Sequence, residues 1–450
     1  MDEAHHFRHA FRKRGQRLYS LTEDKKIYLL TATPINNSLE DLYFLICYLI
    51  PRAAKWEAGR FVPRQDYFAR IGIRDLRSHF NEAEDRLDRV AHMTVDEAAI
   101  AEDFLRTDAL LRAVLIQRSR RYVRESEKLN ENAPLFPERR PPRVIEYSLK
   151  RVYAGIYDDI VTAFSRKQPL VSLAAYNSEA YRKGAKDEKL VVYQHLVVGL
   201  IRTLLLKRLE SSYKAFEASL EELLRKMAGF LAAHDTERFQ AWAQRYKRQW
   251  DLVLEHQRNR FLDEAEDEIE ELDLLDEPEE KLSPEDYDLK RLLDDVVGDM
   301  GQLVTILTKV YEHLTPETDD KLQQFLRVLE TDPRLKQEKV VVFTEFRDTA
   351  RYLYSQLKGR NFEQVEEIDS TRKLNRERVI KRFSPYYNEP DQREIADFLH
   401  DPIRILISTD VLSEGLNLQD AQLSGGRSEP AAQRSQILLS LFQVTKRNTS

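Results

Sequence analysis

Short apolar runs alternate with charged amphipathic segments between residues 339 and 411, and this alternation restricts the fold more than any other feature of the chain. The runs "KVVVFTEF", "FEQVEEID" and "IRILISTDV" have the length and branched residues of strands. Between them lie "RDTARYLYSQLKG" and "TRKLNRERVIKRF", which have the pattern of helices. Such alternation is typical of a parallel sheet with right-handed crossovers. We therefore predict an α/β domain over residues 331–421.

A shorter stretch of the same kind lies near the start of the chain. "KKIYLLTATP" (residues 25–34) is typical of a buried parallel strand that ends at a threonine and a proline. "NNSLEDLYFLICYLIP" follows, with Ser38 as a helix N-cap and two acidic residues in the first turn. Strand, loop and helix predict that residues 1–52 are the end of another α/β lobe.

Residues 53–330 have a different pattern, with long charged amphipathic helices and few glycines. One strand is predicted inside this region, at "RVIEYSL" (residues 143–149). A connector is predicted near 263–285, because acidic residues crowd there without any lysine or arginine up to residue 280. Residues 422–450 contain no strand followed by a charged helix, so they are predicted to lie outside the α/β pattern.

The charge of the chain is unevenly distributed. The formal net charge is −6, but residues 263–280 carry twelve carboxylates, so the rest of the chain carries +6. Basic runs such as "RSRRYVR" (residues 118–124) are compatible with a polyanionic partner. Any single run of this kind is more often the solvated face of a helix or part of a linker.

Three features of the sequence bear on the cellular compartment: its cysteine content, its apolar runs and its first residues. Cys47 is the only cysteine, so the chain can form no intramolecular disulfide, and a reducing compartment fits. The apolar run around Cys47 is shorter than the roughly 20 residues that span a bilayer. The first residues lack the basic and apolar regions of an export signal. We predict a cytoplasmic protein with no membrane partner.

The opening run Asp2, Glu3, Ala4 and His5 is the first candidate site. A carboxylate at the carboxyl end of a parallel strand can hold a hydrated magnesium ion against nucleotide phosphates. A second carboxylate can orient the attacking water. The alternative is an ordinary acidic terminus. Among His5, His6 and His9, two imidazoles lie four residues apart, as in some zinc sites. A zinc site is disfavoured, because no third ligand with suitable spacing appears and the run is not His-Glu-x-x-His.

Further motifs follow the opening run in a fixed order: "LLTATPINNS", "FTEFRDTA", "RILISTD" and "SEGLNLQ". Together they resemble superfamily-two helicase motors, specifically bacterial members of the Swi/Snf-type group, as do "LLKRLESS" and "KRFSPYYN". The resemblance covers most of residues 1–421. It implies an α/β fold with two RecA-like parallel-sheet lobes, the first incomplete, and large α-helical insertions. It also implies ATP and Mg²⁺ as cofactors and double-stranded DNA as partner.

The resemblance assigns roles to residues near the start of the chain. Asp2 and Glu3 match the magnesium and water-activating acids, with Asp2 holding the ion through water. His5 matches the position that links the nucleotide site to a coupling motif, whose residues match Thr31, Ala32 and Thr33. Without the resemblance, Thr31 and Thr33 would simply end a strand.

The second α/β region is assigned in the same way. The positions that match residues near the DNA backbone are Thr344, Thr371, Arg376, Ser408 and Thr409. Those that match the loop facing the nucleotide cleft are Asp410, Glu414, Gly415 and Gln419. Threonine hydroxyls and backbone amides can hold phosphate without reading sequence. Binding to duplex DNA is therefore expected to depend strongly on salt and weakly on sequence.

Two expected motifs do not occur in this sequence. The chain contains no Gly-x-x-x-x-Gly-Lys-Thr/Ser run to cradle phosphates. Arg427 and Arg434 do not match the Gln-x-x-x-Arg-x-x-Arg spacing that supplies a charge-stabilising arginine in the family. We therefore expect an ATP-dependent translocase or remodeller whose first lobe is completed by an upstream polypeptide from a split or truncated frame, with little hydrolysis by this chain alone. The alternative is a non-catalytic DNA-binding or scaffold fragment.

Overall fold

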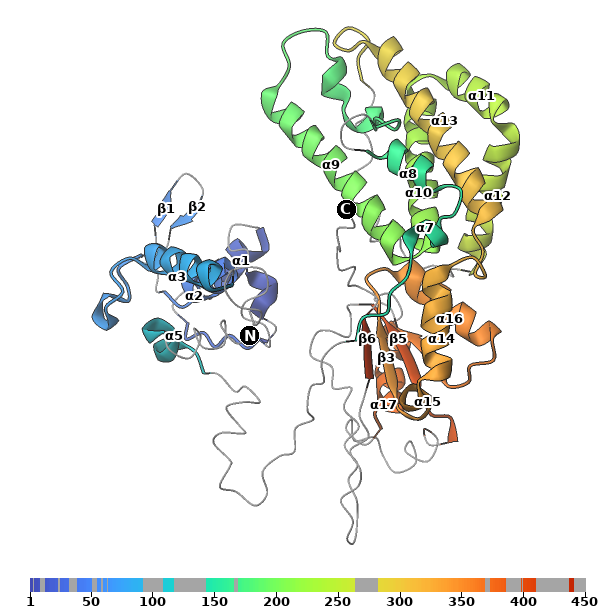
Figure 1. The fold of residues 1–450 in the computed structure, drawn as a ribbon. Helices are drawn as coiled ribbons and strands as arrows, with labels where there is room; N and C mark the ends of the chain where they lie inside the picture. The colour runs from blue at the N-terminus through green and yellow to red at the C-terminus, as the bar shows by residue number, and fades with distance from the viewer. Residues whose placement is uncertain are drawn as a thin grey trace. The chain divides into compact units, whose positions relative to one another are not determined.

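The computed structural model describes residues 1–2, 4–8, 13–22, 25–31, 39–50, 55–57, 60–62, 64–91, 108–116, 143–165, 169–263, 282–368, 373–385, 398, 400–409 and 437–440. The chain divides into two compact units, Met1–Glu138 and Arg139–Ser450 (Figure 1). This division falls inside the range 53–330, which the sequence pattern assigns to helical insertions. Each unit has its own hydrophobic core.

The first unit is built around the apolar helix α2 (Leu39–Cys47). Glu40 and Asp41 lie in its first turn, as predicted, where carboxylates favour the positive end of a helix. Apolar side chains of α2, α3 and α5 form the core of this unit. The other described elements are η1 (Ala4–Phe7), α1 (Lys13–Leu21), β1 (Lys55–Glu57), β2 (Arg60–Val62), η2 (Ala69–Ile71), α3 (Leu76–Ala91) and α5 (Ala109–Val114).

The first residues of the chain pair with the segment 26–31. The Met1 amino group donates to the Tyr28 carbonyl at 2.7 Å, and the Leu30 amide donates to the Met1 carbonyl at 2.9 Å. Met1 thus bonds to the residues before and after Leu29, which is the hydrogen-bond pattern of two parallel strands. The segment itself belongs to no strand, and the sheet of the described part of this unit is the antiparallel β1–β2 hairpin. The described residues therefore do not show the predicted first RecA-like lobe.

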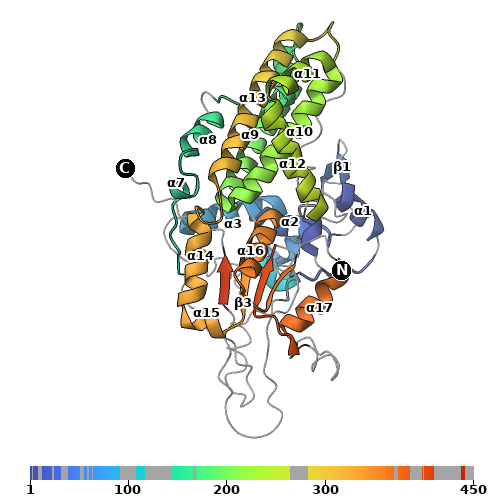
Figure 2. The same cartoon turned by 90° about the vertical axis from the view of Figure 1, so that its right-hand side faces the viewer.

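Long helices make up the first part of the second unit, and α9, α10 and α13 run side by side in both views (Figures 1 and 2). Ser212 separates α9 from α10 and caps α10 by accepting a hydrogen bond from the Ala215 amide at 3.1 Å. The helices are α7 (Leu149–Val152), α8 (Tyr157–Ala163), α9 (Glu188–Ser211), α10 (Tyr213–His234), α11 (Thr236–Arg245), α12 (Lys247–Asp263) and α13 (Leu289–His313), with the short turns η3 (Ala174–Tyr176) and η4 (Ser178–Tyr181).

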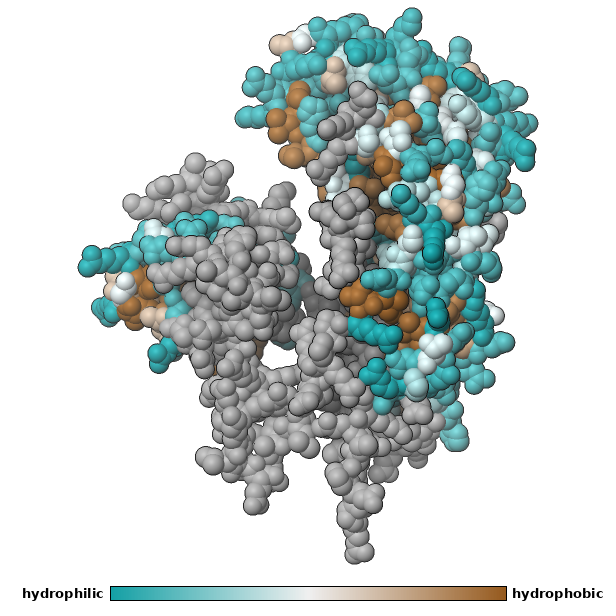
Figure 3. Space-filling model, in the orientation of Figure 1, coloured by the Kyte–Doolittle hydropathy of each residue, from teal (hydrophilic) through white to brown (hydrophobic). Residues whose placement is uncertain are grey.

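Among the described residues, α9 is the one helix long and apolar enough to cross a membrane by length and composition. Its inner side packs into the helical core, while its outer side exposes the apolar residues Val192, Tyr193, Leu196, Leu200 and Leu206. Figure 3 shows apolar surface over this helix. The buried side chains of Gln194 and Arg208 are both hydrogen-bonded within the protein, which is typical of a helix that packs against protein.

The sheet of the second unit is parallel throughout, as predicted for residues 331–421. Its strands are β3 (Val340–Phe343), β4 (Val365–Ile368), β5 (Ile405–Ser408) and β6 (Ile437–Ser440), and their order is β4-β5-β3-β6. β6 lies in the range 422–450, where the sequence pattern predicted no strand of the α/β kind. It pairs with β3, a strand nearly a hundred residues earlier in the chain.

Helices cover both faces of this sheet. α14 (Asp320–Thr331) and α16 (Arg347–Gly359) pack against one face, and α17 (Lys373–Phe383) packs against the other. The first face presents Val340, Val342, Ile405 and Ile407, and the second presents Val341, Leu406 and Ile368. This alternation follows from the two-residue period of a strand. A short helix, α15 (Pro333–Gln337), leads into β3.

One predicted strand is wrong. Residues 143–148 belong to no strand, and α7 begins at Leu149 with Ser148 as its N-cap. The Ser148 amide donates to the Asp320 carboxylate at 2.8 Å, so this backbone group is bonded to a side chain of α14 rather than to a sheet. The predicted acidic connector falls largely on residues 264–281, which lie outside the described residues.

Candidate functional site

The carboxyl ends of β3, β4 and β5 meet at one edge of the sheet, where open α/β sheets bind ligands. The Thr344 amide donates to the Ser408 carbonyl at 2.9 Å. The Thr409 amide donates to the Ile368 carbonyl at 3.4 Å. The structure therefore brings together Thr344, Ser408 and Thr409, three of the residues that the resemblance selects for the second lobe.

The hydroxyls of this cluster are turned toward the backbone. Thr344 and Ser408 are buried, with exposed fractions of 1% and 0%. The Ser408 hydroxyl donates to the Thr409 carbonyl at 2.7 Å, and the Thr344 hydroxyl donates to the Phe346 carbonyl at 3.5 Å. In this conformation the hydroxyls stabilise the strand ends, and neither is presented to solvent.

The other predicted residues of the second lobe are placed only in part. Arg376 lies on α17 and is half-buried. Five residues lie outside the described residues: Thr371, Asp410, Glu414, Gly415 and Gln419.

In the first unit, His5 and Thr31 are in contact. The His5 Nδ1 and Thr31 Oγ1 atoms are 3.1 Å apart and form a hydrogen bond. His5 is 5% exposed, whereas Asp2 is exposed. The Ala4 amide donates to the Leu30 carbonyl at 2.9 Å, so backbone pairing holds the two segments together beside this side-chain contact. Glu3, Ala32 and Thr33 lie outside the described residues.

A second set of residues contacts the loop after β3, and it was not identified as a site from the sequence. The Arg208 guanidinium donates to the Asp348 carboxylate at 2.8 Å and lies 4.6 Å from the centre of the Phe346 ring. Lys207 donates to Glu345 at 3.3 Å. These residues belong to the motif "LLKRLESS", which contributes to the resemblance to the Swi/Snf-type group but assigns no role to its residues.

Two serines of the same motif complete this contact. The Thr349 hydroxyl lies 2.7 Å from the Ser211 hydroxyl and 2.8 Å from that of Ser212. All of these partners lie between the end of β3 and the first turn of α16. The end of α9 and the start of α10 are therefore joined to the loop that follows a sheet strand, directly beside Thr344.

Lys321 of α14 also contacts the place where α9 ends and α10 begins. Its ammonium donates to the Glu210 and Ser211 carbonyls, both at 2.7 Å, at the carboxyl end of α9. A cation at this position satisfies carbonyls that have no partner within the helix. Burial lowers the pKa of Lys321 from 10.5 to about 8, which the nearby carboxylate of Asp319 opposes.

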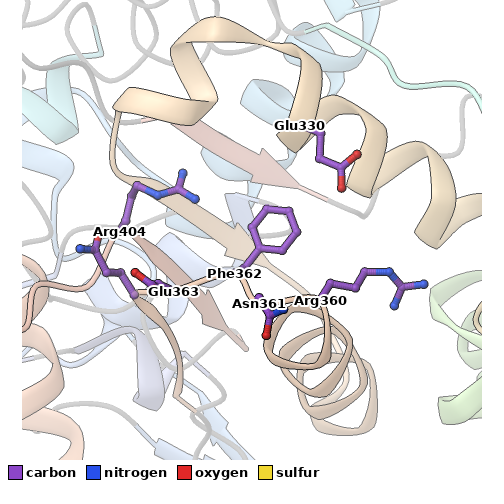
Figure 4. Close-up of a pocket in the computed structure, with 7 residues that line it drawn as sticks. Glu330, Arg360, Asn361, Phe362, Glu363 and Arg404 are labelled. Carbon is purple, nitrogen blue, oxygen red and sulfur yellow. The ribbon is translucent and has the colours of Figure 1, made fainter.

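A hollow of about 480 Å³ lies at the opposite edge of the sheet. Its lining comes from residues just before β4 and β5 and from the end of α14: Glu330, Arg360, Asn361, Phe362, Glu363, Gln364 and Arg404. Arg360 and Arg404 lie on opposite sides of the Phe362 ring (Figure 4). Because it lies at the amino ends of the strands, this hollow is remote from the edge where open parallel sheets bind ligands.

Comparison with known proteins identifies part of the chain. Residues 320–424 match the family of the helicase conserved C-terminal domain. The comparison with curated proteins finds none that matches. The matched range contains α14 to β5 and both strand ends of the cluster around Thr344. The parallel sheet with helices on both faces is compatible with a RecA-like lobe, and the match supports a superfamily-two helicase-like protein with a function related to nucleic acids.

Proposed function

We propose that this chain is part of an ATP-dependent double-stranded DNA translocase, a helicase-like remodeller of the Swi/Snf type. The observation that carries the proposal is the helicase C-terminal match over residues 320–424. Motifs that precede this range, among them "LLTATPINNS" and "LLKRLESS", extend the resemblance to helicase motors toward the start of the chain. A translocase of this class moves along the DNA backbone, and the resemblance matches Thr344, Ser408 and Thr409 to positions near that backbone.

The contact between His5 and Thr31 supports the proposed coupling role. The hydrogen bond of 3.1 Å joins His5, two residues after the candidate acid Glu3, to Thr31, the first residue of the proposed coupling motif. A shift of one segment would therefore move the other. In this proposal the two segments carry the nucleotide state toward the DNA-binding surface, with Ala32 and Thr33 continuing the path.

The chain's own residues fit part of a magnesium-nucleotide site. Asp2 is exposed beside the paired segment 26–31, where a carboxylate can hold a hydrated Mg²⁺. Bound Mg²⁺ would neutralise charge on the phosphates of ATP. The sequence supplies no phosphate-cradling loop, so no hydrolytic step follows from this chain alone. We propose that an upstream polypeptide supplies that loop.

The test is DNA-stimulated ATP hydrolysis by the chain, measured with and without a polypeptide that carries the phosphate loop. We expect stimulation by duplex DNA only in the mixed sample, and its loss when the loop lysine of the added polypeptide is replaced by alanine. A soluble complex without DNA-stimulated hydrolysis would contradict the proposal.

Duplex binding by the chain itself separates the translocase from a scaffold fragment. The translocase predicts that affinity for two unrelated duplexes is equal, falls steeply with salt, and changes when a nucleotide is added to the mixed sample. A non-catalytic DNA-binding fragment would show the same salt slope with no effect of nucleotide. The sequence favours that alternative only through its lack of a phosphate loop.

A further inference from the structure

Three side chains that commonly bind metal ions meet inside the helical block, away from the sheet edge. Glu217 and Glu221 lie one turn apart on α10, and His256 lies on α12. One ligand atom from each of the three lies within 4.8 Å of the other two. Ligands around a tetrahedral zinc ion lie about 3.4 Å apart, given bonds of about 2.1 Å. Small side-chain rotations would therefore close these three around one ion.

Burial distinguishes this cluster from the acidic groups that are common on protein surfaces. Glu217 is 3% exposed and Glu221 is 0% exposed. Two carboxylates that are one helical turn apart repel each other, and burial strengthens that repulsion. Lys214 pairs with Glu217 at 2.9 Å and supplies one compensating charge. A divalent cation bound by both carboxylates would further reduce this repulsion.

Tyr311 of α13 positions two of the three side chains. Its hydroxyl donates to the Glu221 carboxylate at 2.6 Å. Its ring stacks on the His256 imidazole, with the centroids 3.9 Å apart and the planes at 9°. Residues that orient metal ligands in this way typically hold them through hydrogen bonds and packing. The Gln257 side chain donates to the Glu221 carbonyl at 3.2 Å and ties α12 to α10 beside the cluster.

We propose that Glu217, Glu221 and His256 bind a divalent first-row transition ion, for which Zn²⁺ is the reference probe. Two carboxylate oxygens and one imidazole nitrogen suit such an ion better than Mg²⁺, which prefers oxygen and water. The ion would join α10, α12 and, through Tyr311, α13. The role is structural: it fastens α12, the last described helix before the acidic segment, to the bundle that contacts the loop after β3.

The experiment uses the full chain, stripped with a chelator and then titrated with ZnCl₂ by calorimetry and with CoCl₂ by visible absorption. We expect one equivalent of metal per chain, a rise in melting temperature with Zn²⁺, and Co²⁺ absorption bands that Zn²⁺ removes. Glu221→Gln and His256→Asn are each expected to weaken Zn²⁺ binding at least tenfold. Tyr311→Phe keeps the ring and loses the hydroxyl, so a smaller loss is expected.

Glu222→Gln is the matched control, because Glu222 is the next residue on α10 and pairs with Arg225 instead. It should bind Zn²⁺ like the unmodified chain. Circular dichroism without metal establishes that each variant folds. If Glu221→Gln does not fold, His256→Asn decides the matter, since His256 is only half-buried. The proposal is overturned if the unmodified chain binds neither metal, or if His256→Asn binds Zn²⁺ as tightly as the unmodified chain does.

Discussion

The segment 26–31 and strand β3 have similar sequences, but only β3 is a strand of a sheet. "KIYLLT" and "KVVVFT" are both apolar runs that follow a lysine and end at a threonine. In β3, Val340, Val341 and Val342 are fully buried between helices. In the first segment, Tyr28 is 76% exposed and Leu30 is 59% exposed, while Ile27 and Leu29 pack against the core of the unit. The comparison teaches that the apolar run that became a strand of the parallel sheet is the one whose two faces are both covered.

The difference in burial between the two segments is tested most directly by placing the same charge in each of them. Val342→Asp should destabilise the second unit by about 4 kcal/mol or more, because the carboxylate would be buried without a partner. Leu30→Asp should change stability by only about 0.5 kcal/mol, because the side chain is mostly exposed. Urea unfolding followed by circular dichroism measures both. Equal losses in the two variants would show that the segments are buried alike.

The next largest effect concerns the loop that follows β3. Arg208 is 5% exposed and its loss would leave the Asp348 carboxylate without this partner, so Arg208→Met should cost about 3 kcal/mol. Lys207 is 54% exposed, so Lys207→Met should cost less than about 1 kcal/mol. Thermal unfolding of the two variants provides the measurement. If Lys207→Met lowers stability as much as Arg208→Met does, the buried pair of Arg208 and Asp348 is not the main contact that stabilises this loop.

A smaller effect is expected from the threonine that ends each run. Thr31→Val removes the hydrogen bond of 3.1 Å to His5 and should cost about 1 kcal/mol. Thr344→Val removes a longer contact of 3.5 Å and replaces a buried hydroxyl with a methyl group of similar shape, so its cost should be near zero. Urea unfolding again separates them. A larger loss for Thr344→Val would reverse this ranking of the two sites.

A further effect is a pH dependence of stability at the contact between Lys321 and the carboxyl end of α9. The pKa of Lys321 is lowered from 10.5 to about 8 in the folded chain, so between these values the unfolded chain holds a proton that the folded chain has released. Stability from this group should therefore rise as pH increases from about 8 to 10.5. Lys321→Met should lack this part of the slope. Identical pH profiles for the two proteins would exclude the lowered pKa.

Elements with a strong local pattern were predictable from the sequence. The run "RDTARYLYSQLKG" has the same bounds as α16, and the predicted strands contain β3, β4 and β5. Helix period, strand alternation and capping residues act over a few neighbouring positions, so they can be read without the fold. Of the candidate site residues, Thr344 and Ser408 lie within the predicted strand runs, but that β3 and β5 are neighbours in the sheet was not predicted.

Elements that depend on distant partners were not predictable. The run 143–149 has strand composition, but its backbone bonds to Asp320 on α14 instead of a sheet. β6 pairs with β3, and no local pattern near residue 437 indicates a partner that lies nearly a hundred residues earlier in the chain. The contact of "LLKRLESS" with the loop after β3 likewise joins residues far apart in the chain.

The sequence by itself determined the bounds of α16 and the positions of strands β3, β4 and β5 in the second unit. Only the tertiary structure decided which runs became buried strands and which side chains met. It placed Glu217 and Glu221 beside His256 and joined Arg208 to Asp348. The physical reason is range: hydrophobic periodicity and capping are local, whereas burial and charge pairing depend on segments that only the folded chain brings together.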